Sequence, residues 1–106
     1  MITLNNETEI KDLIESADMA LIYFSGTTCG VCEVLKRKIT DILAAYPKIR
    51  FGVINGESHV ELMGSYGIFT VPQFIVYVYG KETLREGRNL DLQMFEERIK
   101  RYYSFL

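Results

Sequence analysis

The sequence predicts an α/β fold in which helices cover both faces of a mixed central sheet, with the element order βαβαβαββα. Short apolar runs of strand length alternate with amphipathic helical segments in the first half of the chain, which implies parallel crossovers. Two strand-like runs separated by a tight turn then predict an antiparallel hairpin. A length of 106 residues, with 48% of them apolar, suits one domain over residues 1–106.

The first third of the chain has clear signals for where its elements start. Residues 1–4 are the candidate first strand, and Asn6, with Glu9 three residues later, marks the start of a helix. The continuous apolar run at 19–25 is typical of a strand that is covered on both faces. The apolar residues of the helix share one face: Ile10, Leu13, Ile14 and Ala17.

The middle third predicts a long helix, a strand and a short helix. The long helix spans about residues 30–46, and Pro47 lies just beyond its end. Residues 50–55 form the strand, and the short, weak helix that follows ends at Gly64 or Gly67. The buried stripe of the long helix comprises Val31, Leu35, Ile39, Ile42, Leu43 and Tyr46.

The last third predicts the hairpin and a final helix. Residues 73–80 and 82–87 are the paired strands, and the tight turn between them is placed at Gly80–Lys81. The final helix follows from Asp91 onward. Its apolar face comprises Leu92, Phe95, Ile99, Tyr102 and Leu106.

Charge and hydropathy argue against two classes of partner. The net charge is −2 and the sequence pI is about 5.4, whereas nucleic acids and anionic membrane surfaces require a basic patch. The N-terminal residues do not resemble a secretory signal, and no apolar run is long enough to span a bilayer. We therefore expect a cytoplasmic protein that binds neither nucleic acid nor membrane.

Cys29 and Cys32 are the only cysteines, and they lie where a buried strand ends and a helix begins. The Cys29 sulfur takes the place of an N-cap acceptor, so that free first-turn N–H groups and the helix dipole favour its thiolate. Such placements lower a cysteine pKa from about 8.5 to roughly 3.5–7.5. Cys29 is therefore the candidate nucleophile, and Cys32, one turn later, is the candidate resolving thiol. Gly30 between them permits a tight turn and the close approach of a substrate.

Two other interpretations of the cysteines remain open. They could be small, inert core residues, although the position between strand and helix is specific. They could also be half of a zinc site, but such a site needs four ligands and His59 is the only histidine. We expect no metal within one chain.

The motif Cys29-Gly-Val-Cys32 after a buried strand, the run YGIFTVPQ at 66–73, and the hairpin-then-helix finish together resemble the thioredoxin family. The resemblance covers essentially the whole chain. It implies the thioredoxin fold, a redox-active Cys29–Cys32 disulfide with no bound cofactor, and a cis bond between Val71 and Pro72. It further implies that the backbone before this proline pairs with the substrate chain. The implied substrate-binding residues are Gly30, Val31, Thr70, Val71, Pro72 and Gly87.

Several positions depart from the family pattern around the cysteines. Thr28 stands where tryptophan is usual, Val31 where proline is usual, and Glu33 where lysine is common. Glu33 opposes thiolate formation, although an exposed charge is well screened. Around the glycine before the last helix, charged Glu86 and Arg88 replace small apolar residues, and they either face water or make the docking rim more selective.

The largest departure lies beneath the cysteines. Many thioredoxins have a buried aspartate and a nearby lysine there, and the matching positions are Tyr23 and Val53. A tyrosine with a pKa near 10 cannot act as a base at neutral pH. We expect Tyr23 to pack in the core with its hydroxyl group satisfied. Deprotonation of Cys32 is then slower, or uses Glu33 or water.

The predicted function is thiol-disulfide exchange with protein substrates, with electrons supplied by an external reductase, in a monomeric protein. Two alternatives are kept. One is a glutaredoxin-like enzyme that uses glutathione, because TVPQ and GRNLDL at 70–73 and 87–92 are similar to glutathione-contacting segments. The other is a redox switch or a non-catalytic interaction module, in which one of Tyr102 and Tyr103 packs in the core and the other joins an interface.

Overall fold

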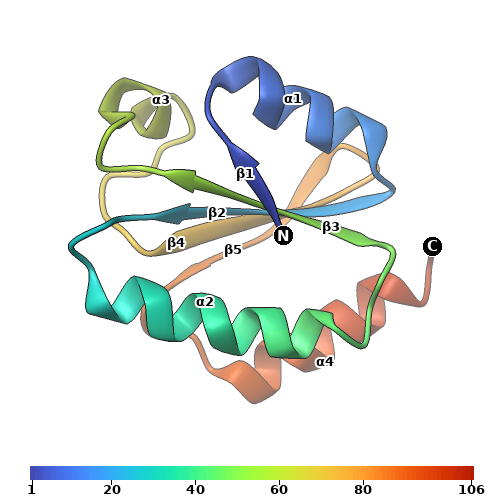
Figure 1. Ribbon diagram of the computed structural model, residues 1–106. Helices are drawn as coiled ribbons and strands as arrows, with labels where there is room; N and C mark the ends of the chain where they lie inside the picture. Colours follow the sequence, from blue (N-terminus) through green and yellow to red (C-terminus); the bar gives the residue numbers. More distant parts are fainter.

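Five strands and four helices alternate along the chain in the computed structural model, which describes residues 1–106 (Figure 1). The strands are β1 (Ile2–Leu4), β2 (Met19–Ser25), β3 (Ile49–Asn55), β4 (Gln73–Val78) and β5 (Lys81–Gly87). The helices are α1 (Glu7–Ser16), α2 (Gly30–Leu43), α3 (Val60–Ser65) and α4 (Leu92–Tyr103). This order is the predicted βαβαβαββα. None of the four helices has both the length and the apolar content needed to cross a membrane.

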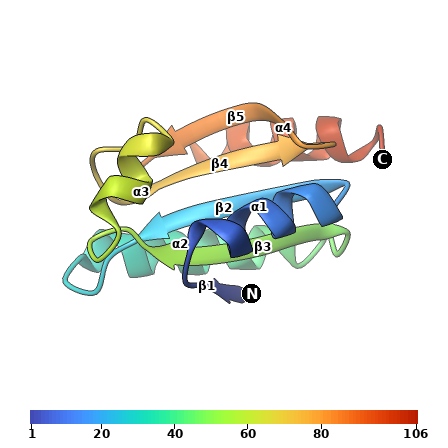
Figure 2. The ribbon, with the colours of Figure 1, turned by 90° about the horizontal axis from the view of Figure 1, so that it is seen from above.

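The strands form one mixed sheet in the order β1-β3-β2-β4-β5 (Figure 2). β3 pairs in parallel with both β1 and β2, whereas β4 pairs antiparallel with both β2 and β5. Parallel neighbours require a crossover, and α1 and α2 supply it. The predicted combination of parallel crossovers and a closing hairpin is therefore confirmed.

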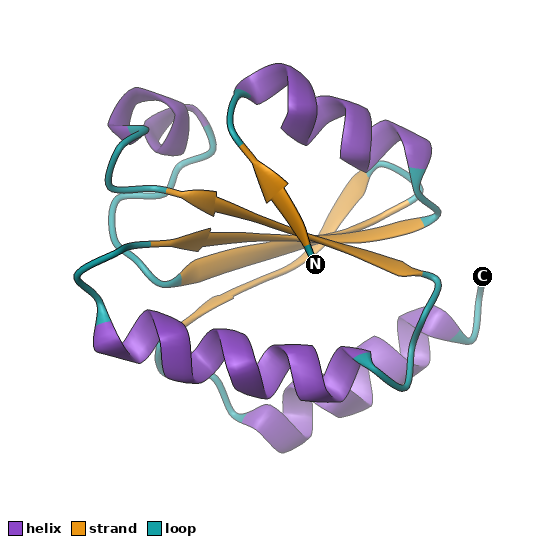
Figure 3. Ribbon diagram, in the orientation of Figure 1, coloured by secondary structure: helices purple, strands orange, loops and turns teal.

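Helices cover both faces of the sheet, with α1 and α3 on one face and α2 and α4 on the other (Figure 3). β2 lies at the centre and is buried at every position, which explains its continuous apolar run. Its side chains alternate between two cores, because successive strand residues point to opposite faces. Leu21 and Tyr23 pack with residues of α2 and α4, while Ile22 and Phe24 pack with residues of α1 and α3.

The predicted start of α1 is confirmed, but α2 ends earlier than predicted. Asn6 caps α1 and accepts a hydrogen bond from the Glu9 N–H at 2.9 Å. α2 ends at Leu43 rather than Tyr46, because Tyr46 N–H bonds back to Leu43 O in a tighter i to i−3 turn. Pro47 disfavours helical geometry at the residue before it, which is Tyr46. The helix therefore ends before the apolar stripe does.

The hairpin turn lies one residue earlier than predicted. Its central residues are Tyr79 and Gly80, with φ angles of 48° and 79°, while Lys81 already belongs to β5. Positive φ at both positions is typical of a type I′ turn, whose twist suits a two-residue hairpin. Tyr79 is unusual there, and a Gly-Lys turn was the stronger sequence signal. Gly67, with a φ of 71°, follows α3, whereas Gly64 lies inside that helix.

Both C-terminal tyrosines contact the core, so the prediction that one of them is exposed is wrong. Tyr102 and Tyr103 are half-buried against the cluster between the sheet, α2 and α4. The Tyr103 hydroxyl group accepts a hydrogen bond from Lys48 N–H at 3.1 Å, and its ring packs edge-on against Tyr46. Consecutive helical positions are 100° apart, and the width of the apolar face accommodates both.

Candidate active site

The strand registers bring four separate segments to one end of the sheet. Ser25 at the end of β2 pairs with Asn55 at the end of β3, and Phe24 pairs with Gln73 at the start of β4. Gln73 in turn pairs with Gly87 at the end of β5. The loops that follow β2, β3 and β5 and the loop that precedes β4 therefore meet at this end, where α2 begins (Figure 1).

Cys29 and Cys32 lie at the start of α2, and their sulfur atoms are bonded in a disulfide. Cys29 is the N-cap residue of the helix, and its Sγ accepts a hydrogen bond from Cys32 N–H at 3.1 Å. Cys29 is partly exposed, whereas Cys32 is fully buried. The cap that the sequence predicts is therefore present, and only one of the two sulfur-bearing residues is open to solvent.

The two residues between the cysteines are both exposed. Val31 presents 45% of its surface, so an apolar side chain lies exposed two residues after Cys29. Gly30 has no positive φ, and a Cβ atom added to it would meet nothing within 4 Å. The turn itself therefore does not require glycine at position 30, contrary to our expectation. The expected close approach of a substrate chain to Gly30 stays a prediction.

The loop before β4 and the end of β5 complete the predicted rim. The Val71–Pro72 peptide bond is cis, with Pro72 buried, Val71 half-buried and Thr70 exposed. Gly87 lies directly against this loop, because a Cβ atom there would come within 3.1 Å of Pro72 O. The structure thus brings together all the residues that the sequence assigned to the site, and their roles in binding remain predictions.

Tyr23 lies beneath the cysteines and is fully buried. Its hydroxyl group donates a hydrogen bond of 2.8 Å to Cys32 O, so the predicted core position with a satisfied hydroxyl is confirmed. Burial, and secondarily the charge of Glu33, raises the pKa of Tyr23 above its ordinary value of 10. Val53 pairs with Tyr23 in the neighbouring strand. Neither of these two positions supplies a charged group to the site.

Glu33 follows Cys32 in the first turn of α2, with its side chain exposed to solvent. Lys36 Nζ lies 2.9 Å from its Oε1 in an i, i+3 ion pair. A nearby cation offsets the effect of a carboxylate on a thiolate, and water screens what remains. Lys36 therefore partly offsets the negative charge that appeared in the sequence as a departure from the family pattern.

Sequence reasoning missed Glu57, which holds the loop that leads to Cys29. Its carboxylate accepts hydrogen bonds from Thr27 N–H at 2.8 Å and from the Thr28 hydroxyl at 3.0 Å. A Cβ atom at Gly26 would lie 2.5 Å from Glu57 Cδ, so glycine leaves room for this contact. The available signal in the sequence was the position of Glu57 two residues after β3. Because β3 runs parallel to β2, Glu57 lies at the same end of the sheet as the loop before Cys29.

These contacts make Glu57 sensitive to acid. The hydrogen bond from Thr27 N–H, followed by that from the Thr28 hydroxyl, lowers the pKa of Glu57 below its ordinary value of 4.5. A lowered folded-state pKa stabilises the protein above the unfolded-state pKa, and this contribution is lost as the pH falls through the folded-state value. Since the carboxylate is exposed, its contribution to the free energy of unfolding is small, and its effect is confined to the loop before Cys29.

Glu57→Gln is expected to flatten the pH dependence of stability below about pH 4.5, the ordinary value for this carboxyl. Denaturant unfolding of both proteins from pH 6 to pH 3 measures this. The amide protons of Thr27 and Thr28 should also exchange faster in the variant at neutral pH. Glu61→Gln, an exposed carboxylate of α3 without a hydrogen bond to the loop, is the matched control. An unchanged pH slope in Glu57→Gln would contradict the assignment.

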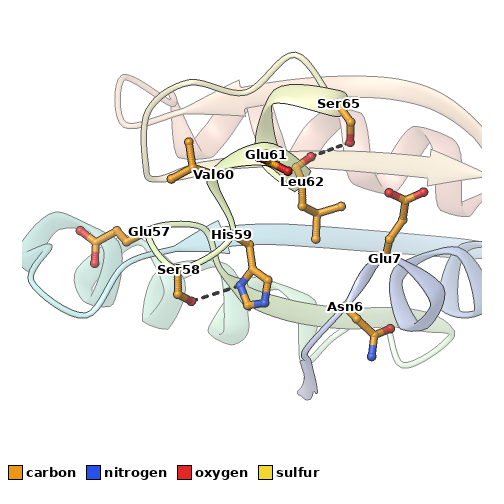
Figure 4. A pocket seen from close by; sticks show the side chains of 9 residues that line it. All are labelled: Asn6, Glu7, Glu57, Ser58, His59, Val60, Glu61, Leu62 and Ser65. Carbon is orange, nitrogen blue, oxygen red and sulfur yellow. Dashed lines mark hydrogen bonds between the residues drawn. The ribbon is translucent and has the colours of Figure 1, made fainter.

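His59 lies in an open hollow of about 710 Å³ between the start of α1 and α3 (Figure 4). Its Nδ1 lies 2.8 Å from Asn55 O and its Nε2 lies 3.0 Å from Asn5 O, so the ring joins two backbone segments. Glu57 lines the same hollow and points away from His59. The structure contains no group of three or more histidine, cysteine, aspartate or glutamate residues that could hold a metal ion.

Known proteins share this fold. A thioredoxin-like protein from Bacillus subtilis, YdfQ, is 31% identical over 97% of this chain and 92% of its own length. The oxidised mitochondrial thioredoxin 3 of Saccharomyces cerevisiae superposes with a TM-score of 0.82 at 26% identity, covering 94% of this chain and 93% of its own. A mutant thioredoxin from Halobacterium salinarum superposes with a TM-score of 0.84 at 22% identity, covering 96% and 89%.

A further similar chain comes from a structural study of how the thiol of the yeast mitochondrial 1-Cys peroxiredoxin is resolved via glutathione/thioredoxin systems. It superposes with a TM-score of 0.82 at 25% identity, covering 94% of this chain and 93% of its own. The thioredoxin family model matches residues 1–101, which include the capped cysteine pair and the cis-proline loop. With this match over nearly its whole length, the chain belongs to the thioredoxin family.

Proposed function

We propose that the protein is a thiol-disulfide oxidoreductase that reduces disulfides of protein substrates through Cys29 and Cys32. The observation that supports this most directly is the capped sulfur. Cys29 Sγ accepts a hydrogen bond from Cys32 N–H at the positive end of α2, within bonding distance of the second sulfur. In the reduced protein the same N–H and the helix dipole favour a thiolate at Cys29, and thiolate is the attacking species.

The exchange proceeds in two steps. Cys29 thiolate attacks one sulfur of the substrate disulfide, and that bond breaks as the mixed disulfide forms. The released substrate sulfur takes a proton. Cys32 thiolate then attacks Cys29 Sγ, which forms the Cys29–Cys32 disulfide and releases the second substrate sulfur, which is also protonated. The substrate gains two electrons and two protons, and an external reductase returns the protein to its dithiol form.

The substrate chain docks beside the cis-proline loop. Val71 lies outside the strands, and its main-chain N–H has no hydrogen-bond partner in the protein. An unpaired backbone group at such an edge is suited to pairing with an extended peptide. Gly30, Val31 and Thr70 then face the incoming chain, and Gly87 keeps the neighbouring strand end close to the loop.

The same proposal extends to partners and location. The substrates are protein disulfides, a class supported by the likeness to a chain from a structural study of a 1-Cys peroxiredoxin. No bound cofactor takes part beyond the disulfide itself. The protein acts as a monomer in the cytoplasm, where it transfers electrons from a reductase. The match to thioredoxins favours this over the glutaredoxin-like alternative. The half-buried tyrosines contribute less to the surface that the interaction-module alternative needs than fully exposed ones would.

A dithiol-coupled reduction assay tests the proposal. With a small dithiol as donor, the protein is expected to accelerate reduction of a protein disulfide by at least an order of magnitude over the dithiol alone. Protein alkylated at its thiols is the control and should give only the background rate. Glutathione as sole donor should support far less turnover, because the proposal assigns reduction to a reductase. A rate equal to background, or equal turnover with glutathione, would count against it.

A further inference from the structure

Arg88 lies where β5 ends against the cis-proline loop. Gly87 pairs with Gln73, and the next residue, Arg88, extends its side chain back over Val71. Arg88 Nη2 donates a hydrogen bond of 3.1 Å to Val71 O. This is the only hydrogen bond made by the main chain of Val71. The guanidinium group therefore occupies the acceptor that a docking backbone would use.

The guanidinium group has unused capacity to bind a carboxylate. Arg88 is exposed and takes part in none of the three ion pairs of the protein. A guanidinium group carries five N–H donors in a planar fork that matches a carboxylate. One donor is engaged by Val71 O, and the others have no hydrogen-bond partner in the protein.

The neighbouring carboxylates are directed elsewhere. Asp91 caps α4 and accepts hydrogen bonds from two first-turn N–H groups. Glu86 pairs with Phe74 across the strands, so its side chain lies on the α4 side of the sheet, where it lines a hollow with Arg98. Glu57 is engaged by the loop before Cys29. The positive charge of Arg88 is therefore the charge that an arriving substrate chain meets next to Val71.

We propose that Arg88 is a specificity determinant that selects substrates with an acidic side chain beside the target disulfide. This rests on the proposed disulfide exchange. When a substrate docks, its backbone N–H replaces the guanidinium group at Val71 O, and Arg88 turns to pair with the substrate carboxylate. A neutral substrate replaces the hydrogen bond without gaining the ion pair, and a basic substrate meets like charge.

Three disulfide peptides test the inference, identical except for Glu, Gln or Lys next to one cysteine. At low ionic strength the wild-type protein should reduce the Glu peptide about two- to fivefold faster, in kcat/KM, than the Gln peptide, and the Lys peptide most slowly, as expected of an exposed ion pair. Added salt should shrink these ratios. Arg88→Gln should remove the preference, and Arg88→Glu should reverse it in favour of the Lys peptide.

Arg101→Gln is the matched control, since it removes the same charge near the far end of α4 (Figure 1). It should keep the wild-type ratios between the peptides. Equal rates for the three peptides in the wild type, or a preference unaffected by either Arg88 variant, would overturn the inference while leaving the disulfide exchange standing. Failure of the wild-type protein to reduce any of the peptides would overturn the proposed function and the inference together.

Discussion

Cys29→Ser is expected to abolish turnover of a protein disulfide, whereas Cys32→Ser is expected to complete the first attack and then stall. The asymmetry follows from exposure and capping. Cys29 is partly exposed and its sulfur receives the Cys32 N–H, while Cys32 is fully buried and cannot meet an incoming substrate. A serine hydroxyl at position 29 is too poor a nucleophile to replace the thiolate. Without Cys32, nothing in the chain resolves the mixed disulfide.

The measurement is intact mass after mixing each variant with a disulfide substrate. Because the chain has only two cysteines, any covalent adduct of Cys32→Ser reports Cys29 alone. With a substrate whose disulfide joins two separate peptides, its mass should rise by that of one peptide thiol less two hydrogens, and the adduct should be released by an added dithiol. Cys32→Ala should give the same trapped species, which excludes a role for the new hydroxyl group. Equal residual turnover in Cys29→Ser and Cys32→Ser would refute the division of roles.

Local signals predicted most of the fold. Asn6 with Glu9 fixed the start of α1, and the unbroken apolar run of β2 indicated a strand covered on both faces. The two boundary errors both involve competing local geometry. Apolar periodicity continued to Tyr46 although the helix had already tightened, and the hairpin turn placed Tyr79 at positive φ where glycine is the usual choice. Periodicity measures which side chains are buried, and it does not report where the backbone leaves helical dihedrals.

The site was predictable where neighbours in sequence make it and less so where the fold assembles it. The Cys29 cap is made within one helical turn, so the sequence pattern alone indicated it. Glu57 and Thr28 are 29 positions apart in the sequence, and Arg88 and Val71 are 17 positions apart. Their contacts depend on which strand ends lie side by side, and this follows only from the sheet register. The charged rim was visible in the sequence, but the atom that Arg88 contacts was not.

Tyr23 shows how the chain compensates for the missing buried aspartate. Its ring stacks on Phe74 with centroids 6.4 Å apart and meets Phe51 edge-on at 6.3 Å, so it fills the space beneath the cysteines. Its hydroxyl group donates to Cys32 O rather than to a sulfur atom. The hydroxyl group therefore anchors the first turn of α2. We still expect proton transfer from Cys32 to use water or Glu33.

Tyr23→Asp is accordingly expected to lower the free energy of unfolding by about 3–5 kcal/mol near neutral pH, the range for truncating a large buried aromatic side chain, with a further cost from the buried charge. The asparagine of Tyr23→Asn has nearly the same size as aspartate but no charge. The difference in stability between the two variants therefore isolates the cost of the buried charge. Tyr23→Phe removes only the hydrogen bond to Cys32 O and should lose about 1 kcal/mol. Because Tyr23 is not a base, Tyr23→Phe should also keep most of the reduction rate.

The pH dependence separates lost packing from buried charge. Burial raises the folded-state pKa of a carboxyl group at position 23 above its unfolded value of about 3.9. The stability that the neutral carboxyl group allows is therefore fully present below the unfolded-state pKa. It is lost as the pH rises through the folded-state pKa. Denaturant unfolding from pH 3 to pH 8 should show Tyr23→Asp and Tyr23→Asn converging at acid pH and diverging toward neutral pH. A constant gap between them across this range would mean that the new carboxylate reaches solvent, and that the space beneath Cys32 is less enclosed than the buried ring of Tyr23 indicates.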